Sequence, residues 1–179
     1  MKQLLLSILV CFTSILLQAQ IYSTNLATAK FVSDAPLEII KAESNQLRGV
    51  IDISKKKFAF KLFIKTFDGF NSPLQKEHFY ENYMEVKSFP EAVFQGKILE
   101  EIEMENSKSY RAKGILSIHG LSNEVIINVD LGPGESGLKF KSAFEVPLKD
   151  YEIELPRIVY QKIAEIINVE VSGELTLRQ

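Results

Sequence analysis

One histidine of the chain stands among carboxylates in a segment rich in aromatic side chains. Glu77, His78 and Glu81 follow one another closely, and on a helix the side chains of His78 and Glu81 would face the same side. A His-x-x-Glu pair can ligate a metal, but it supplies two ligands where a catalytic zinc takes three from the protein. We interpret His78 as a helix-surface histidine beside solvated carboxylates, with a polar contact at a pocket opening as the alternative, and predict no metal site.

The only other histidine, His119, stands before Gly120 at the expected end of a strand. A histidine there usually bonds the backbone of the turn, and a contact to a ligand headgroup is the alternative. The sequence has no Gly-rich phosphate loop, nucleophile elbow, zinc-protease helix or calcium loop. No catalytic residue and no cofactor are therefore predicted. A hydrolase-like enzyme would have to use His78 or His119 as acid or base without a visible nucleophile.

The charge of the chain gives no sign of a polyanionic partner. The formal net charge is -2, so there is no basic field of the kind that binds nucleic acid. The run from Lys55 to Lys57 is interpreted as a solvated hairpin tip, with a contact to an anionic headgroup as the alternative. We expect a solvent-exposed strand end that carries Glu100, Glu101, Glu103 and Glu105.

The elements that must position these residues are mostly strands. Apolar and polar residues alternate with period two along much of the chain, which is the pattern of strands with one buried face. Short turns at 119–123 and 132–137 separate them and favour antiparallel hairpins. We predict an all-β fold, a closed barrel or sandwich of eight or nine strands. The expected strand segments are 30–33, 37–42, 47–53, 58–65, 93–103, 110–118, 124–131, 138–146 and 167–177.

Two segments interrupt the alternation and predict short helices. Ser72, Pro73 and Gln75 form a helix start, with Ser72 as the N-cap and Gln75 closing a capping box, and this helix would run to about Met84. The second segment extends from Pro156 to about 166, where apolar residues recur with helical spacing on one face.

The first 19 residues read as a secretory signal peptide. A short positive start precedes an apolar run over 4–17, and Ala19 precedes the expected cut. Cys11, the only cysteine, lies within this run, so the mature chain is expected to hold no disulfide. We also expect no integral membrane segment in the mature chain. We expect a periplasmic or secreted domain over 20–179.

Several stretches in this order resemble the YceI-like family of bacterial envelope proteins. The stretches that carry the resemblance are FVSDAPLE (31–38), LRGVID (47–52), FDGFNSPL (67–74) with EHFYENYM (77–84), FPEAVFQGKI (89–98), GILSIHG (114–120), DYEI (150–153) and PRIV (156–159). The resemblance implies an antiparallel, eight-stranded, lipocalin-like barrel with one or two short helices. It also implies a long apolar tunnel that holds an isoprenoid or similar amphiphile in some members.

Alternation and resemblance together predict a binding protein whose apolar rings line a cavity. Phe89 is also expected to face the barrel, and His78 and His119 are the candidates for a headgroup contact. A filled barrel that binds a partner, and a homodimer, remain open. The predicted wall residues are Phe58, Phe60, Leu62, Phe79, Tyr83, Phe94, Leu116, Phe140 and Phe144.

Overall fold

The computed structural model describes residues 20–178, and the expected signal peptide lies outside them. Eight strands follow one another as an antiparallel meander that closes into a barrel, because β1 pairs with both β2 and β8. This confirms the predicted eight-stranded barrel. The strands are β1 (Ile21–Ala35), β2 (Glu38–Asp52), β3 (Lys57–Phe63), β4 (Glu91–Ile98), β5 (Lys108–Ile118), β6 (Leu121–Pro133), β7 (Gly137–Pro147) and β8 (Ile166–Leu177).

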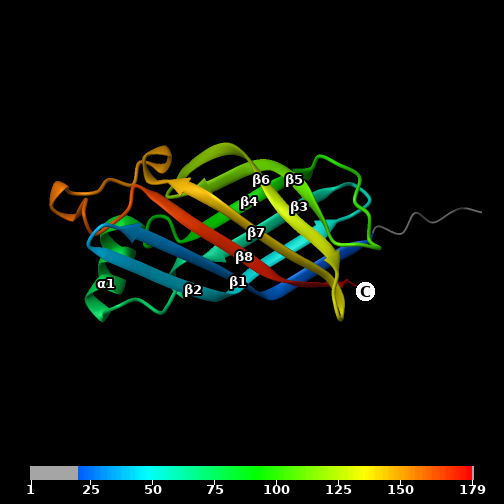
Figure 1. Ribbon diagram of the computed structural model, residues 1–179, viewed down its shortest axis with the longest axis horizontal. Helices are drawn as coiled ribbons and strands as arrows, with labels where there is room; N and C mark the ends of the chain where they lie inside the picture. The colour runs from blue at the N-terminus through cyan, green and yellow to red at the C-terminus, as the bar shows by residue number, and fades with distance from the viewer. Residues whose placement is uncertain (1–19, 179) are drawn as a thin grey trace, which may run out of the picture.

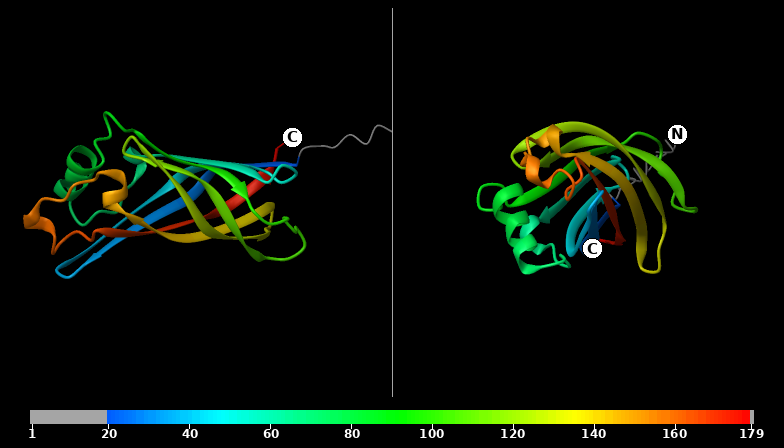
Figure 2. Two further views of the ribbon diagram at one scale, coloured as in Figure 1. Left: turned by 90° about the horizontal axis from the view of Figure 1, so that it is seen from above. Right: turned by 60° about the vertical axis from the view of Figure 1, so that its left-hand side comes forward.

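Helical segments gather mainly at one end of the barrel. Figure 1 shows α1 at the same end as the turn between β1 and β2 and the segment that leads into β8, while the end of β8 lies at the opposite end. The view along the barrel in Figure 2 shows the strands wrapping around a common axis. The helical segments are η1 (Ile64–Thr66), α1 (Pro73–His78), the π-helix η2 (Phe79–Tyr83), η3 (Leu148–Tyr151) and η4 (Arg157–Val159).

The first two strands are longer than the sequence indicated. The expected strands at 37–42 and 47–53 are one strand, β2, and the segment 30–33 is part of the fifteen-residue β1. Pairing of β1 with β2 shifts register on either side of Ala27. Such bulges break the apolar–polar alternation without ending the strand, which is why the sequence pattern divided it.

The helix start at Ser72 is confirmed, but the helix changes type. The Ser72 Oγ accepts a hydrogen bond from the backbone N–H of Gln75 at 3.2 Å, and the Gln75 side chain accepts from the N–H of Asn71. After His78 the backbone widens into a π-helical turn, in which the N–H of Met84 donates to the carbonyl of Phe79 at 2.9 Å. The helical path therefore reaches about Met84, as predicted.

The second predicted helix is wrong. Only η4, Arg157–Val159, is helical between Pro156 and β8. Beyond it, the N–H groups of Lys162 and Ile163 still donate to the carbonyl of Val159. Other groups bond to the barrel: the carbonyl of Gln161 accepts from the N–H of Leu37 at 2.8 Å, and the N–H of Ala164 donates to Ser33 Oγ at 2.8 Å. These tertiary hydrogen bonds keep the segment from continuing as a helix.

The predicted strand at 93–103 is shorter than expected. Strand β4 ends at Ile98, and the glutamates that follow lie in the loop before β5. They form exposed ion pairs there, Glu100 with Arg111 at 2.6 Å and Glu101 with Lys56 at 2.7 Å. Lys56 lies in the turn between β2 and β3, as the hairpin-tip interpretation expects.

Strands β6 and β7 pair along only part of their length. Strands β6 and β7 are thirteen and eleven residues long, yet they pair only from Val129–Ser142 to Pro133–Leu138. Toward the end that carries α1 the two strands diverge. A hollow of about 330 Å³ lies there, and it shares Leu116, Ile127 and Phe144 with the main cavity.

Candidate functional site

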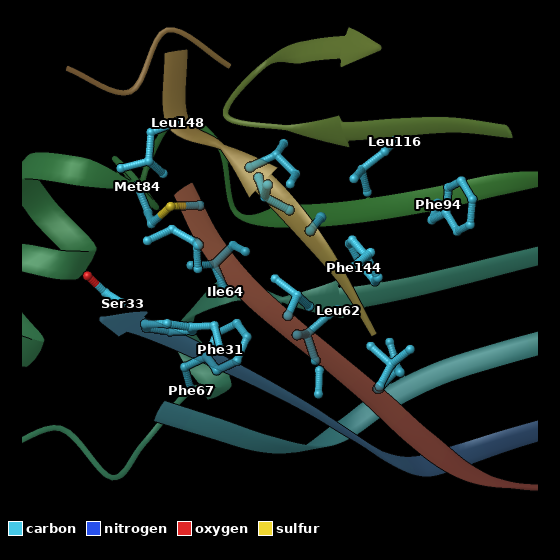
Figure 3. Close-up of a pocket in the computed structure, with 18 of the residues that line it drawn as sticks. Phe31, Ser33, Leu62, Ile64, Phe67, Met84, Phe94, Leu116, Phe144 and Leu148 are labelled. Carbon is cyan, nitrogen blue, oxygen red and sulfur yellow. The ribbon is translucent and has the colours of Figure 1, made fainter. Parts of the chain in front are cut away.

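The interior of the barrel is hollow. A cavity of about 600 Å³ runs inside it, within the range of roughly 300–1,000 Å³ that small-molecule sites occupy. Rings such as Phe94 and Phe144 point inward (Figure 3) yet are only half-buried, because part of their surface borders the open space of the cavity. The barrel is therefore not filled by its own core.

All nine residues predicted as the wall line this cavity. They do so because cross-strand pairing continues the inward face from strand to strand: Phe60 is paired with Phe94, and Phe94 with Leu116. That these side chains contact a ligand stays a prediction. The residues of this set that border the cavity are Phe58, Phe60, Leu62, Phe79, Tyr83, Phe94, Leu116, Phe140 and Phe144.

Sequence reasoning missed much of the wall contributed by β1, β2 and β8. For β8 the alternation was visible, but its inward residues are aliphatic and carry none of the aromatic rings on which the predicted wall was based. For β1 and β2 the bulge hid the pattern. The lining residues missed on these strands include Phe31, Ile40, Leu47, Ile51, Ile167, Val169, Val171 and Leu175.

An aromatic cluster crosses the deep part of the cavity. The rings of Phe58 and Phe94, on adjacent strands, have centroids 4.8 Å apart. The ring of Phe60 on β3 lies 5.1 Å from that of Phe140 on β7, although these strands are not neighbours in the sheet. Beyond Phe140, Leu138 and Leu175 are fully buried and close that end.

A second aromatic cluster holds the helical segment against the open end. Phe31 on β1 stacks on Phe79 of η2 with centroids 5.2 Å apart, and it meets Phe67 edge-on at 5.1 Å. Phe70 packs on Phe79 at 5.1 Å. Aromatic pairs of this kind add about 0.5–1.5 kcal/mol each beyond area burial. The cluster thus fixes α1 and η2 beside the opening.

Two buried serines of the lining already have hydrogen-bond partners within the protein. Ser33 and Ser142 are buried, at 2% and 4% exposure. The Ser33 hydroxyl accepts from the N–H of Ala164, and the Ser142 hydroxyl donates to the carbonyl of Asn128 at 2.5 Å. Neither serine oxygen is left as an unpartnered site, so the deep cavity presents an apolar surface to a guest.

Charged and amide side chains line the cavity only at its open end, which we call the mouth. They are Glu38, Gln75, His78 and Lys162. The Gln75 amide donates to a carboxylate oxygen of Glu38 at 2.9 Å, so this pair links α1 to the start of β2. An amphiphile with its tail inside would place its polar end among these groups.

The structure puts His78 at the mouth and does not give it metal-binding partners. His78 is exposed and lines the cavity, which fits the pocket-opening alternative, and its contact to a headgroup stays a prediction. The carboxylate of Glu81 is directed at Lys87, 3.7 Å away. Within residues 20–178 no three metal-ligating side chains lie close enough together to hold an ion.

His119 has a different place, outside the cavity lining. It forms a two-residue hairpin turn with Gly120, and both residues have positive φ, 52° and 78°, so the turn is shorter than the 119–123 segment expected. Its Nδ1 lies 3.1 Å from the carbonyl oxygen of Tyr151, and its Nε2 lies 3.8 Å from Glu85. The ring therefore meets the backbone of η3 and not that of its own turn, which differs from the turn-bonding interpretation. The headgroup contact stays a prediction.

Phe89 does not face the cavity, contrary to expectation. Its ring meets the His119 ring edge-on with centroids 4.6 Å apart, and it covers Gly120 so closely that a Cβ there would be 2.5 Å away. The ring therefore closes the β5–β6 turn from outside. Nothing in the local sequence distinguishes this from an inward ring, because Phe89 precedes β4 and lies outside its alternation.

Burial changes the acidity of two tyrosines in the mouth segment. It raises the pKa of Tyr83, which lines the cavity, above the usual range. Burial also raises the pKa of Tyr80, whose hydroxyl donates to the carbonyl of Phe67 at 2.5 Å. Both phenols stay neutral at physiological pH, so these two side chains add no negative charge beside the opening.

Within the part of the chain that the structure describes, there is no helix with the length and apolar character needed to cross a bilayer.

Similar proteins place the fold in a known group. A polyisoprenoid-binding domain from Saccharophagus degradans implicated in plant cell wall breakdown is 9% identical and superimposes with a TM-score of 0.75 over 90% of this chain and 100% of that one. BcnA of Burkholderia cenocepacia is 13% identical, with a TM-score of 0.69 over 83% of this chain and 94% of that one. A YceI protein of Campylobacter jejuni is 15% identical, with a TM-score of 0.55 over 72% and 78%.

At these identities the likeness concerns the fold. No curated protein sequence matches the chain. The profile of the YceI-like domain matches residues 24–177, which is nearly the whole barrel from β1 to β8. The chain therefore belongs to the YceI-like domain family.

Proposed function

We propose that this protein holds an isoprenoid or a similar long-chain amphiphile in its barrel cavity. It would do so in the periplasm or outside the cell, after removal of residues 1–19, and would thereby transport, sequester or protect its guest. The observation that supports this most is the cavity of about 600 Å³ itself, apolar in its depth and polar only at its mouth. The similar domain from S. degradans is described as polyisoprenoid-binding.

The energetics favour a hydrocarbon guest. Each CH₂ group removed from water contributes about 0.8 kcal/mol, so a five-carbon isoprene unit contributes roughly 4 kcal/mol before association costs. The aromatic clusters around Phe60 and Phe79 are already packed, so binding does not have to order the wall. A few isoprene units therefore suffice for useful affinity without a specific headgroup contact.

Native mass spectrometry of protein purified from its own host tests the proposal. A co-purifying amphiphile at about one per chain is expected, and solvent extraction should identify it. Phe144→Asp, which puts a carboxylate in the wall, should abolish retention. The matched variant Ile126→Asp, at an outward position of β6 that is 56% exposed, should retain the guest. Protein that is empty and also ignores prenyl and acyl probes would contradict the proposal.

An enzyme using His78 or His119 is the competing function. The two histidines are not brought together at the cavity, since only His78 lines it. Replacing both by alanine should abolish turnover if the protein is an enzyme, whereas a binding protein should keep its guest. The filled-barrel interaction protein gains no support, because the lumen is open.

A further inference from the structure

We infer that the mouth of the barrel docks on a lipid bilayer, with the cavity opening facing the membrane. This rests on the proposed function, because it concerns how a water-insoluble guest reaches the cavity. Of the eleven large apolar side chains that are exposed in the described part of the chain, six belong to segments at the mouth. They are Leu37, Ile39, Leu74, Ile158, Tyr160 and Ile166.

These side chains come from separate segments around one opening. Leu37 is in the β1–β2 turn and is 66% exposed, Leu74 is on α1 and is 59% exposed, and Ile158 is in η4 and is 87% exposed. Figure 1 shows these three segments at the same end of the barrel. Residues adjoining the exposed ones, such as Glu38 and Val159, line the cavity, so the apolar ring borders the opening.

The ring is held in place and is not a set of loose tips. The N–H of Leu37 donates to the carbonyl of Gln161 at 2.8 Å, which fixes the β1–β2 turn to the segment after η4. The N–H of Ala164 donates to Ser33 Oγ near the end of β1. Hydrogen bonds therefore hold the loop that carries Ile158 and Tyr160 in place. Both side chains nevertheless stay exposed to water, which is unfavourable for their apolar surface.

The charges and the tyrosine in this loop suit a lipid headgroup region. Arg157 and Lys162 flank Ile158 and Tyr160 in sequence and are exposed, and within residues 20–178 neither forms a salt bridge in this structure. Cations attract an anionic lipid surface, and a half-exposed tyrosine places its ring at the headgroup level. The part-buried hydrogen bond between Gln75 and Glu38 keeps that carboxylate engaged with α1.

A bilayer fits this ring better than a second copy of the chain. The cavity opens in the middle of the ring, so whatever covers the ring must also receive the tail of the guest. A bilayer covers the apolar side chains and takes up a hydrocarbon chain without passing it through water, which would cost about 0.8 kcal/mol per CH₂ group. A second barrel would satisfy the first requirement and leave the guest enclosed.

Flotation with vesicles of phosphatidylethanolamine and phosphatidylglycerol tests the inference. The experiment uses the full protein, purified after the cell has processed it. Ile158→Ser should lower partitioning about tenfold, as expected for losing one inserted aliphatic side chain. Arg157→Gln should lower it about fivefold, and less so on phosphatidylcholine vesicles. Leu26→Ser is the matched control, since Leu26 is 80% exposed on β1 away from the mouth, and it should not change partitioning.

The outcomes separate docking from guest binding. Native mass spectrometry of the same variants should show the guest retained in Ile158→Ser, because the residue does not line the cavity. Vesicle binding by a protein that is empty and ignores prenyl and acyl probes would leave docking intact and contradict the proposed function. Equal partitioning of Ile158→Ser and Leu26→Ser would overturn docking. A dimer that Ile158→Ser dissociates, in a protein that ignores vesicles, would assign the ring to a second copy and overturn it too.

Discussion

The rings of Phe60 and Phe140 meet across the interior of the barrel, with centroids 5.1 Å apart. Their strands, β3 and β7, share no hydrogen bonds, so this contact spans the lumen and does not follow the wall. It sets how deep a guest can reach, because the space beyond it is occupied by Leu138 and Leu175, which are fully buried.

Removing the Phe60 ring should deepen the cavity. We expect Phe60→Ala to retain a longer or bulkier amphiphile, detected by native mass spectrometry. It should lower the free energy of unfolding by about 2–3 kcal/mol, less than the roughly 3–5 typical of a fully buried Phe, because the ring already borders space. Phe63→Ala is the control, since Phe63 points outward under Lys61. An unchanged guest in Phe60→Ala would show that the ring does not limit depth.

Adding a methyl group at Gly49 should have the opposite effect. A Cβ at Gly49 would lie 2.1 Å from Cε1 of Phe60, so the ring would have to swing into the lumen. We expect Gly49→Ala to reduce guest retention and to cost about 1–3 kcal/mol, as overpacking does. The double variant with Phe60→Ala should recover most of that loss in urea unfolding. If the double variant lost the sum of the unfolding free energies lost by the two single variants, this coupling would be refuted.

Loosening α1 should speed release of the guest. Ser72→Ala removes the N-cap hydrogen bond to Gln75, which is worth about 1 kcal/mol, at a helix that stands beside the mouth. Dissociation of a fluorescent prenyl probe, followed by stopped flow, should become severalfold faster. Ser88→Ala, an exposed serine in the same connection, should leave the rate unchanged. If both variants released the probe alike, α1 would not control the opening.

Alkaline conditions should destabilise the fold through buried phenols. Burial raises the pKa of Tyr80, Tyr83 and Tyr151 in the folded protein. Their stabilising contribution is therefore complete below the unfolded-chain value of about 10 and is lost as the pH rises through the higher folded values. Urea unfolding at stepwise higher pH, with tyrosinate absorbance as the second signal, should show both changes together. A free energy of unfolding that stays constant above about pH 10 would contradict the raised pKa of these tyrosines.

The barrel and its inward face were predictable from sequence because the strands from β3 onward alternate cleanly. Phe58, Phe60 and Leu62 illustrate this, since period two fixes the face of every residue once one is known. The bulges around Ala27 in β1 destroy that rule locally. The prediction for the segment after Pro156 was wrong for another reason. Its apolar spacing is helical, but Ser33 and Leu37 form hydrogen bonds with its backbone groups.

The two histidines illustrate what local sequence cannot decide. His78 lies at the mouth and His119 outside the lining. The position of His119 depends on Tyr151, 32 residues away in sequence, and on the left-handed backbone of the turn. Whether the barrel was hollow depended on volumes summed around eight strands, which no alternation pattern contains.

Closure of the cylinder joins the beginning of the fold to its end. Strand β1 pairs with β8 from Tyr22–Leu177 to Val32–Asn168, contacts separated by well over a hundred residues. Such non-local pairing makes folding slow, and the outer edge of β1 stays bare until β8 has been synthesised. A chain that is still being synthesised therefore has no enclosed cavity, because the cavity forms only when β8 closes the barrel.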